Sequence, residues 1–160
     1  MNTLKSPSLE ETGDMLRESV ISVFNTMLKT KIAAARNPQP PADMLVVGSI
    51  GFVGEANGMV YIRIASPFAK TLASRMLALP EDALDDGMVN DVVGEVSNMI
   101  VGSVKSQLCD SGSPCALTIP SIVRGDRFCI ERTSSADRTL LNFESEDEAV
   151  LVELLMKQIP

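Results

Sequence analysis

The chain has 160 residues, which is enough for one domain of ordinary size with a core of its own. Its 14 basic and 21 acidic residues give a net charge of −7, which disfavours binding to nucleic acid and to anionic membrane surfaces. The absence of His excludes Ser-His-Asp and Cys-His nucleophile systems, His general bases and His-containing zinc motifs.

Residues 1–9 are expected to form a disordered tail, and residues 10–160 a single domain. The tail lacks the apolar segment of a signal peptide, and no apolar run reaches the about 18 residues of a membrane span. The three Cys residues are odd in number and show neither a CxxC pair nor a zinc-type spacing. We therefore expect reduced thiols, a cytoplasmic location, and no metal or cofactor of the chain's own.

The first element is predicted to be a helix over residues 10–35. Apolar side chains recur there three and four positions apart, as on one face of a helix. Ser8 and Glu11 match a capping box, in which each side chain satisfies a backbone N–H of the first turn. The Pro-rich stretch 37–41 is expected to end the helix and to form a stiff linker.

A β-hairpin and a shorter helix are predicted next. Residues 44–53 and 59–64 have strand character, and the segment 55–58 between them supplies Asn-Gly turn chemistry. The following helix is expected to start at Ser66–Pro67, because Pro fits the first helical turn, and to stop before Pro80.

The second half of the chain predicts an acidic connector at residues 81–86, a long helix at 86–108, and then strands. The strands are expected at residues 116–123, 127–133, 138–143 and 149–157. For the last segment, a helix is also open, but its short length favours a strand. If it lies at a sheet edge, it could pair with another chain. Helices grouped apart from hairpin-linked strands indicate an α+β fold, an antiparallel sheet packed against two long helices plus a shorter one.

The helix at residues 86–108 carries the candidate functional residues. At 100° per residue, one side collects the apolar side chains Val89, Val93, Val96, Ile100 and Val104. The opposite side collects Asp91, Glu95, Asn98, Gly102 and Lys105. Glu95 and Asn98 thus stand one turn apart, flanked by Gly94 and Gly102. An exposed Gly lowers the stability of a helix by about 0.8–1 kcal/mol relative to Ala. Two glycines beside one polar pair therefore favour a surface that a partner approaches closely.

A solvated helix face is the alternative interpretation of this stripe. Asp91 near the N-terminal end and Lys105 near the C-terminal end both suit the helix dipole without any further function. Asn98 fits that interpretation less well, because Asn is a mediocre helix former and has no cap to make in mid-helix.

Residues 91–98 spell D-x-x-x-E-x-x-N, which resembles the signature (D/S)-x-x-x-E-x-x-N of the CheX/CheC/FliY chemotaxis phosphatases. The predicted order of elements over residues 10–158 is also similar to CheX. The resemblance implies a phosphatase that dephosphorylates the phospho-aspartate of a CheY-type receiver domain, with Glu95 pairing with the receiver's Lys and Asn98 holding the attacking water. It implies that the receiver supplies Mg²⁺ and that the chain forms a homodimer. The partner-binding surface would include Asp91, Gly94, Gly102 and Lys105.

One site per chain is expected, as in CheX. CheC-like members carry a second copy of the motif on the first helix, and here Asp14 and Glu18 keep its acidic positions while Ile21 replaces the Asn. An apolar side chain cannot orient water. Two alternatives stay open: a non-catalytic CheX-like module that binds a receiver domain or a flagellar motor component, and an unrelated α+β scaffold, which a buried Asn98 would support.

Overall fold

The computed structural model describes residues 7–39, 44–126, 129–133 and 135–157. The elements found in these ranges are α1 (Leu9–Thr26), β1 (Ala33–Ala34), β2 (Met44–Gly54), β3 (Asn57–Ala65), α2 (Ser66–Leu77), the short 3-10 helix η1 (Glu81–Ala83), α3 (Asp86–Asp110), β4 (Cys115–Leu117), β5 (Ser121–Asp126), β6 (Ala136–Ser145) and β7 (Glu148–Lys157). Residues 1–6 of the predicted tail lie outside the described residues.

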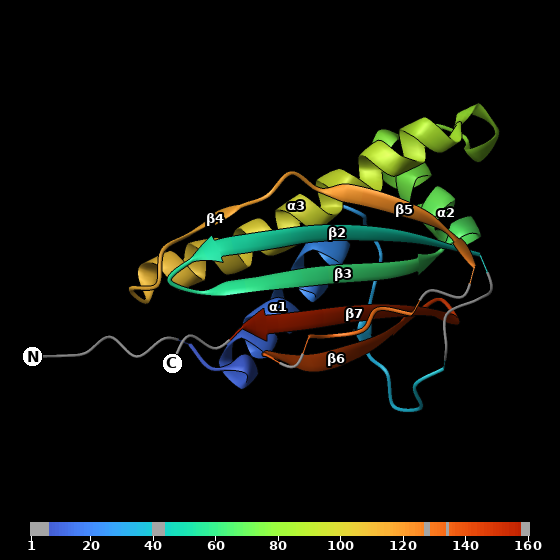
Figure 1. Ribbon diagram of the computed structural model, residues 1–160. Helices are drawn as coiled ribbons and strands as arrows, with labels where there is room; N and C mark the ends of the chain where they lie inside the picture. Colours follow the sequence, from blue (N-terminus) through green and yellow to red (C-terminus); the bar gives the residue numbers. More distant parts are fainter. Residues whose placement is uncertain (1–6, 40–43, 127–128, 134, 158–160) are drawn as a thin grey trace, which may run out of the picture.

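The described strands form one antiparallel sheet in the order β1-β6-β7-β3-β2, with β4 and β5 both paired to the free side of β2. Figure 1 shows α1 and α3 on the same face of this sheet, with α2 at one end of α3. The predicted α+β fold, with an antiparallel sheet and two long helices plus a shorter one, is confirmed.

The core lies between the sheet and its helices. Alternate side chains of β3 and β7 face each other across the ladder, as in the opposed pairs Val60–Leu154, Ile62–Val152 and Ile64–Val150. All six are at most 1% exposed. Burial of each such side chain stabilises the fold by about 1.5–3 kcal/mol relative to its exposure, so the central strands hold the sheet that supports α3.

The first helix ends at Thr26, and its predicted extension to residue 35 is wrong. Lys29 adopts a left-handed backbone with φ of 50°, and the Thr30 N–H donates to the Phe24 carbonyl at 2.9 Å. The left-handed residue turns the chain away from the helix axis, in a backbone conformation that Gly adopts more readily than Lys. The apolar pattern continues past the end because Leu28 and Ile32 are also buried, although they are not helical.

The predicted hairpin is confirmed, with a shifted turn. Strands β2 and β3 extend to Gly54 and Asn57, so only Glu55 and Ala56 connect them. The side chain of Asn57 accepts a hydrogen bond from the Gly54 N–H at 3.0 Å. Asn57 therefore stabilises the connection from the start of the second strand.

The predicted strand 116–123 is split into β4 and β5. Both fragments pair with β2, and residues 118–120 interrupt them. The Thr118 backbone N–H still donates to the Gly51 carbonyl at 2.9 Å, whereas Pro120 has no N–H to donate. The strand predicted at 127–133 is wrong for residues 129–133, which are not in a strand, and residues 127–128 lie outside the described residues.

The last predicted strand is confirmed as β7, but it does not lie at a sheet edge. It pairs with β3 on one side and with β6 on the other. The β6–β7 turn at Glu146 and Asp147 has positive φ at both residues, 51° and 64°, as in a two-residue hairpin loop. Because both edges of β7 are occupied, pairing with another chain through residues 149–157 is excluded.

Candidate functional site

Helix α3 presents its two faces as the helical spacing predicts. The Asp85 side chain caps its start by accepting from the Met88 N–H at 2.8 Å. The five apolar side chains of the predicted stripe are all buried, with exposures of 0–3%. These are Val89, Val93, Val96, Ile100 and Val104.

The polar side of α3 faces outward. Asp91, Glu95 and Asn98 are all exposed, and Lys105 is half-buried. Within the described part of the chain, none of the first three has a side-chain hydrogen bond or an ion pair. The exposure of Asn98 removes the observation that would have favoured an unrelated scaffold.

The two glycines beside this face leave space that the fold does not use. Gly94 is buried, yet a Cβ added there would meet nothing closer than the Ile122 Cδ1, at 3.9 Å. Gly102 is half-buried, and a Cβ there would meet nothing within 4 Å. Internal packing therefore requires neither glycine, and both lower the helix surface around Glu95 and Asn98.

A groove of about 450 Å³ runs between this face of α3 and the interrupted edge of the sheet. Its lining residues are Asn90, Asp91, Gly94, Glu95, Asn98, Pro120 and Ile122. Three of these residues, Asn90, Pro120 and Ile122, are not among the site residues expected from the sequence. A Pro inside a run of strand character, at position 120, was the signal that could have marked the opposite wall.

Arg124 fixes the two walls of this groove to one another. Its Nε donates to the Asn90 Oδ1 at 2.5 Å, and a terminal N–H donates to the Asp86 carbonyl at 3.3 Å. The guanidinium also lies 3.5 Å from the Asp86 carboxylate. Strand β5 is thus tied to the first turns of α3, at Asp86 and at Asn90, which directly precedes Asp91.

Close approach to β2 holds α3 from behind. Gly48 lies beneath Ser97, and a Cβ at this glycine would approach the Ser97 Oγ to 2.2 Å and the Val93 Cγ1 to 3.2 Å. The Ser97 hydroxyl is buried and donates to the Val93 carbonyl at 2.7 Å. Since Ser97 precedes Asn98, the packing that buries one side chain turns the next one outward.

The motif-like positions on α1 make no comparable site. Asp14 is exposed and forms an ion pair with Arg17 at 2.8 Å. Glu18 is exposed, but Ile21 is partly buried against the core. No amide therefore stands beside Glu18 at the position where the motif would place it.

Other features of the described residues add no second candidate for the predicted chemistry. A cavity of about 670 Å³ lies near the β6–β7 turn, lined among others by Lys31, Ser145 and Glu146, and contains none of the predicted site residues. The described ranges hold no group of three or more His, Cys, Asp or Glu residues placed to bind a metal ion. Among the described helices, none is long and apolar enough to cross a membrane.

Comparison with known proteins places this geometry in context. The family model described as chemotaxis phosphatase CheX matches residues 46–144, a range that includes all of α3. The fold is similar to the crystal structure of the chemotaxis protein CheX from Vibrio vulnificus, with a TM-score of 0.78 and 26% sequence identity. The match covers 98% of this chain and 100% of the Vibrio chain. No curated protein sequence matches significantly.

Two further solved structures share the fold. A CheC-like superfamily protein from Shewanella sp. PV-4 is 24% identical, with a TM-score of 0.78 over 99% of this chain and 100% of its own. The CheX of a CheX–CheY–BeF3–Mg²⁺ complex from Borrelia burgdorferi is 19% identical, with a TM-score of 0.72 over 92% and 98% of the two chains.

Proposed function

This chain belongs to the CheX family of chemotaxis phosphatases, and from that premise we propose that it dephosphorylates the phospho-aspartate of a CheY-type receiver domain. The observation that carries the proposal is the pair formed by Glu95 and Asn98. Both side chains are exposed on one face of α3, both line the groove opposite Pro120, and neither has a partner within the described residues.

Asn98 is the proposed catalytic residue. Its amide both accepts and donates hydrogen bonds, so it can hold a water molecule in one orientation. The water oxygen attacks phosphorus in line with the aspartyl oxygen, the bond to that oxygen breaks, and the products are inorganic phosphate and the free carboxylate. Such a transfer has a loose transition state, so positioning contributes more than base strength, which suits a chain without His.

Glu95 is the proposed anchor for the partner. Its carboxylate lies one turn before Asn98 and is free to pair with the Lys of the receiver's active site. Opposite charges across an interface raise the association rate and fix the orientation of the partners. Asp91, Gly94, Gly102 and Lys105 would then lie within or beside the contact surface.

The receiver would also supply Mg²⁺. The Borrelia complex contains CheY, BeF3 and Mg²⁺ together with CheX, which supports a receiver as the partner and the metal as part of its complex. The described part of this chain offers no metal-binding cluster. In this scheme the chain contributes geometry, and the receiver contributes the acyl phosphate, the cation and the Lys.

Release of inorganic phosphate tests the proposal directly. Each CheY-type receiver of the same genome would be phosphorylated in the presence of Mg²⁺ and followed with and without a catalytic amount of the chain. We expect at least one receiver to lose phosphate faster than it does spontaneously. Binding of a receiver with no acceleration in any of them would favour the non-catalytic module instead.

A further inference from the structure

A second groove opens on the other side of Glu95. It has a volume of about 400 Å³ and lies between the end of α2 and the first turns of α3. Four apolar side chains line it, together with two carboxylates: Met76, Leu77, Met88 and Val92, with Asp91 and Glu95. Leu77 is 39% exposed, so part of this apolar lining is accessible from solvent.

The two grooves share a wall. Asp91 and Glu95 line both the groove that contains Asn98 and the apolar groove. A protein surface that docks on the Glu95 carboxylate therefore lies beside the mouth of the apolar groove. Continuity with the proposed phosphatase site is the first argument for a common occupant.

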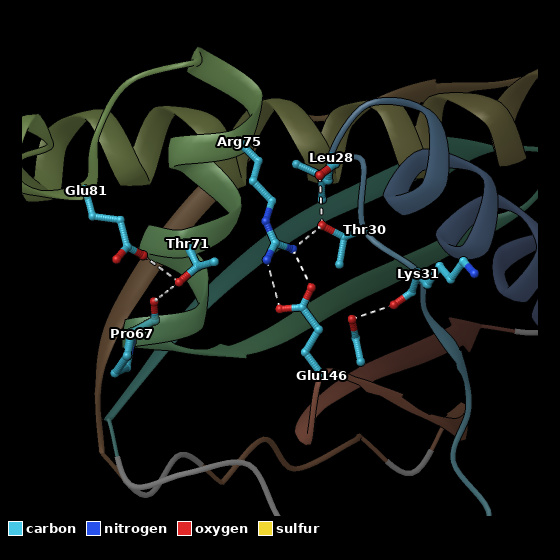
Figure 2. Close-up of polar contacts among 9 residues, drawn as sticks. Leu28, Thr30, Lys31, Pro67, Thr71, Arg75, Glu81 and Glu146 are labelled. Carbon is cyan, nitrogen blue, oxygen red and sulfur yellow. Dashed lines mark hydrogen bonds and ion pairs between the residues drawn. The ribbon is translucent and has the colours of Figure 1, made fainter.

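The α2 wall of the apolar groove is held rigidly. Arg75, which directly precedes Met76 and Leu77, donates to the Thr30 Oγ1 at 2.7 Å and to the Glu146 carboxylate at 2.9 Å (Figure 2). The figure also shows the hydrogen bond from the Thr71 hydroxyl to the Glu81 carboxylate, at 2.5 Å, which ties α2 to η1. A preformed groove binds its ligand at a smaller entropic cost than one that must first be ordered.

The two carboxylates at the apolar groove limit which partners can bind there. Asp91 and Glu95 are exposed carboxylates that form no ion pair within the described residues. The occupant must therefore combine an apolar side chain with a basic group a few ångströms away. A second copy of this chain, with its net charge of −7, fits that requirement poorly.

We propose that the apolar groove between α2 and α3 receives an apolar side chain of the receiver domain, next to the receiver Lys that pairs with Glu95. The proposal rests on the proposed function and extends it by adding a docking contact outside the chemistry. Flexible Met side chains on both walls can adjust to the shape of such a side chain, so the groove adds affinity to that of the Glu95–Lys ion pair, while Asn98 acts on the phosphoryl group of the bound receiver.

Leu77→Gln tests the groove, and Leu79→Gln is its matched control. Leu79 has the same exposure, 39%, and lies two residues further along the chain, but it does not line the groove. Two quantities would be measured for each variant: the receiver concentration at half-maximal phosphate release, and the affinity for a receiver loaded with Mg²⁺ and beryllium fluoride. Thermal unfolding would check that both variants fold like the wild type.

We expect Leu77→Gln to raise both values about 3- to 10-fold with an unchanged maximal rate, because it removes part of a buried apolar contact. Met88→Gln, on the other wall, should act in the same direction, and Leu79→Gln should change neither value by more than the error. If the wild type binds the receiver and accelerates phosphate release, but Leu77→Gln and Leu79→Gln give equal values of both quantities, the docking contact alone would be overturned. Absence of both binding and acceleration by the wild type would overturn the docking contact and the phosphatase proposal together.

Discussion

Glu95 and Asn98 differ in the step of the reaction at which each would act. A carboxylate that pairs with a receiver Lys contributes equally to the ground state and the transition state, so its loss affects binding. An amide that orients the attacking water acts only when the phosphoryl group is transferred, so its loss affects turnover. The one-turn spacing on α3 allows a single docking event to place both groups.

For Glu95, the change to make is Glu95→Gln, which keeps the shape and removes the charge. We expect the receiver concentration at half-maximal rate to rise roughly tenfold, with the maximal rate within a factor of about three. The effect should shrink at high salt, because salt screens the ion pair. Glu18→Gln is the matched control, since Glu18 is the exposed acid of the incomplete motif on α1. An equal effect of the two substitutions, or an effect only on the maximal rate, would contradict the role of Glu95.

Gly94 allows a prediction that separates folding from docking. A Cβ at this position has room within the fold, and Ala is a better helix former than Gly by about 0.8–1 kcal/mol. Gly94→Ala should therefore raise the free energy of unfolding by about that amount, measured in urea, while it lowers the affinity for the receiver. A destabilised Gly94→Ala variant would show that the glycine serves internal packing instead.

At the scale of single residues, the sequence predicted one half of the groove. The period of α3 fixes which side chains point away from the core, so Asp91, Glu95 and Asn98 were placed correctly on the exposed face. Pro120 and Ile122, on the opposite wall, depend on how β5 pairs with β2. That pairing is a long-range contact, and no local spacing encodes it.

The elements that support the groove are joined by side-chain contacts between distant parts of the chain. Arg124 ties β5 to α3, and Arg75 ties α2 to the β6–β7 turn. The end of α1 was mispredicted because Lys29, and not a glycine, occupies the left-handed position after the helix, so the sequence shows no helix-ending residue there. The two arginine contacts join residues far apart in the sequence, so no local pattern could predict them.

The Arg75–Glu146 pair predicts a dependence of stability on pH. The hydrogen bond from Arg75 holds the pKa of the Glu146 carboxyl below its ordinary value, and the same pairing raises the pKa of Arg75. A carboxyl with a lowered pKa stabilises the folded state above its unfolded-state pKa, and this stabilisation is lost as the pH falls through the folded-state pKa. The difference in unfolding free energy between the wild type and Glu146→Gln should therefore be present at neutral pH and vanish in acid. A constant difference across the acidic range would contradict the pairing.

For the molecule as a whole, the α+β class and the antiparallel sheet followed from the order of helices and hairpin-linked strands. The position of each strand in the sheet did not follow, because β7 joins two hairpins that are far apart in the sequence. Among the described strands, the remaining edges are β1 and the interrupted pair β4 and β5. The homodimer implied by the resemblance stays a prediction, and light scattering at twice the mass of one chain would support it.

The proposed phosphatase mechanism depends on Asn98, and its most direct test is Asn98→Ala measured with a saturating concentration of phosphorylated receiver and Mg²⁺. We expect the maximal rate of phosphate release to fall about 100-fold or more, because the attacking water is no longer held in line. The affinity for the receiver loaded with beryllium fluoride should stay within about threefold of the wild type. A variant that retains the wild-type rate, or that loses binding in proportion to its rate, would contradict the assignment of Asn98 to the chemical step.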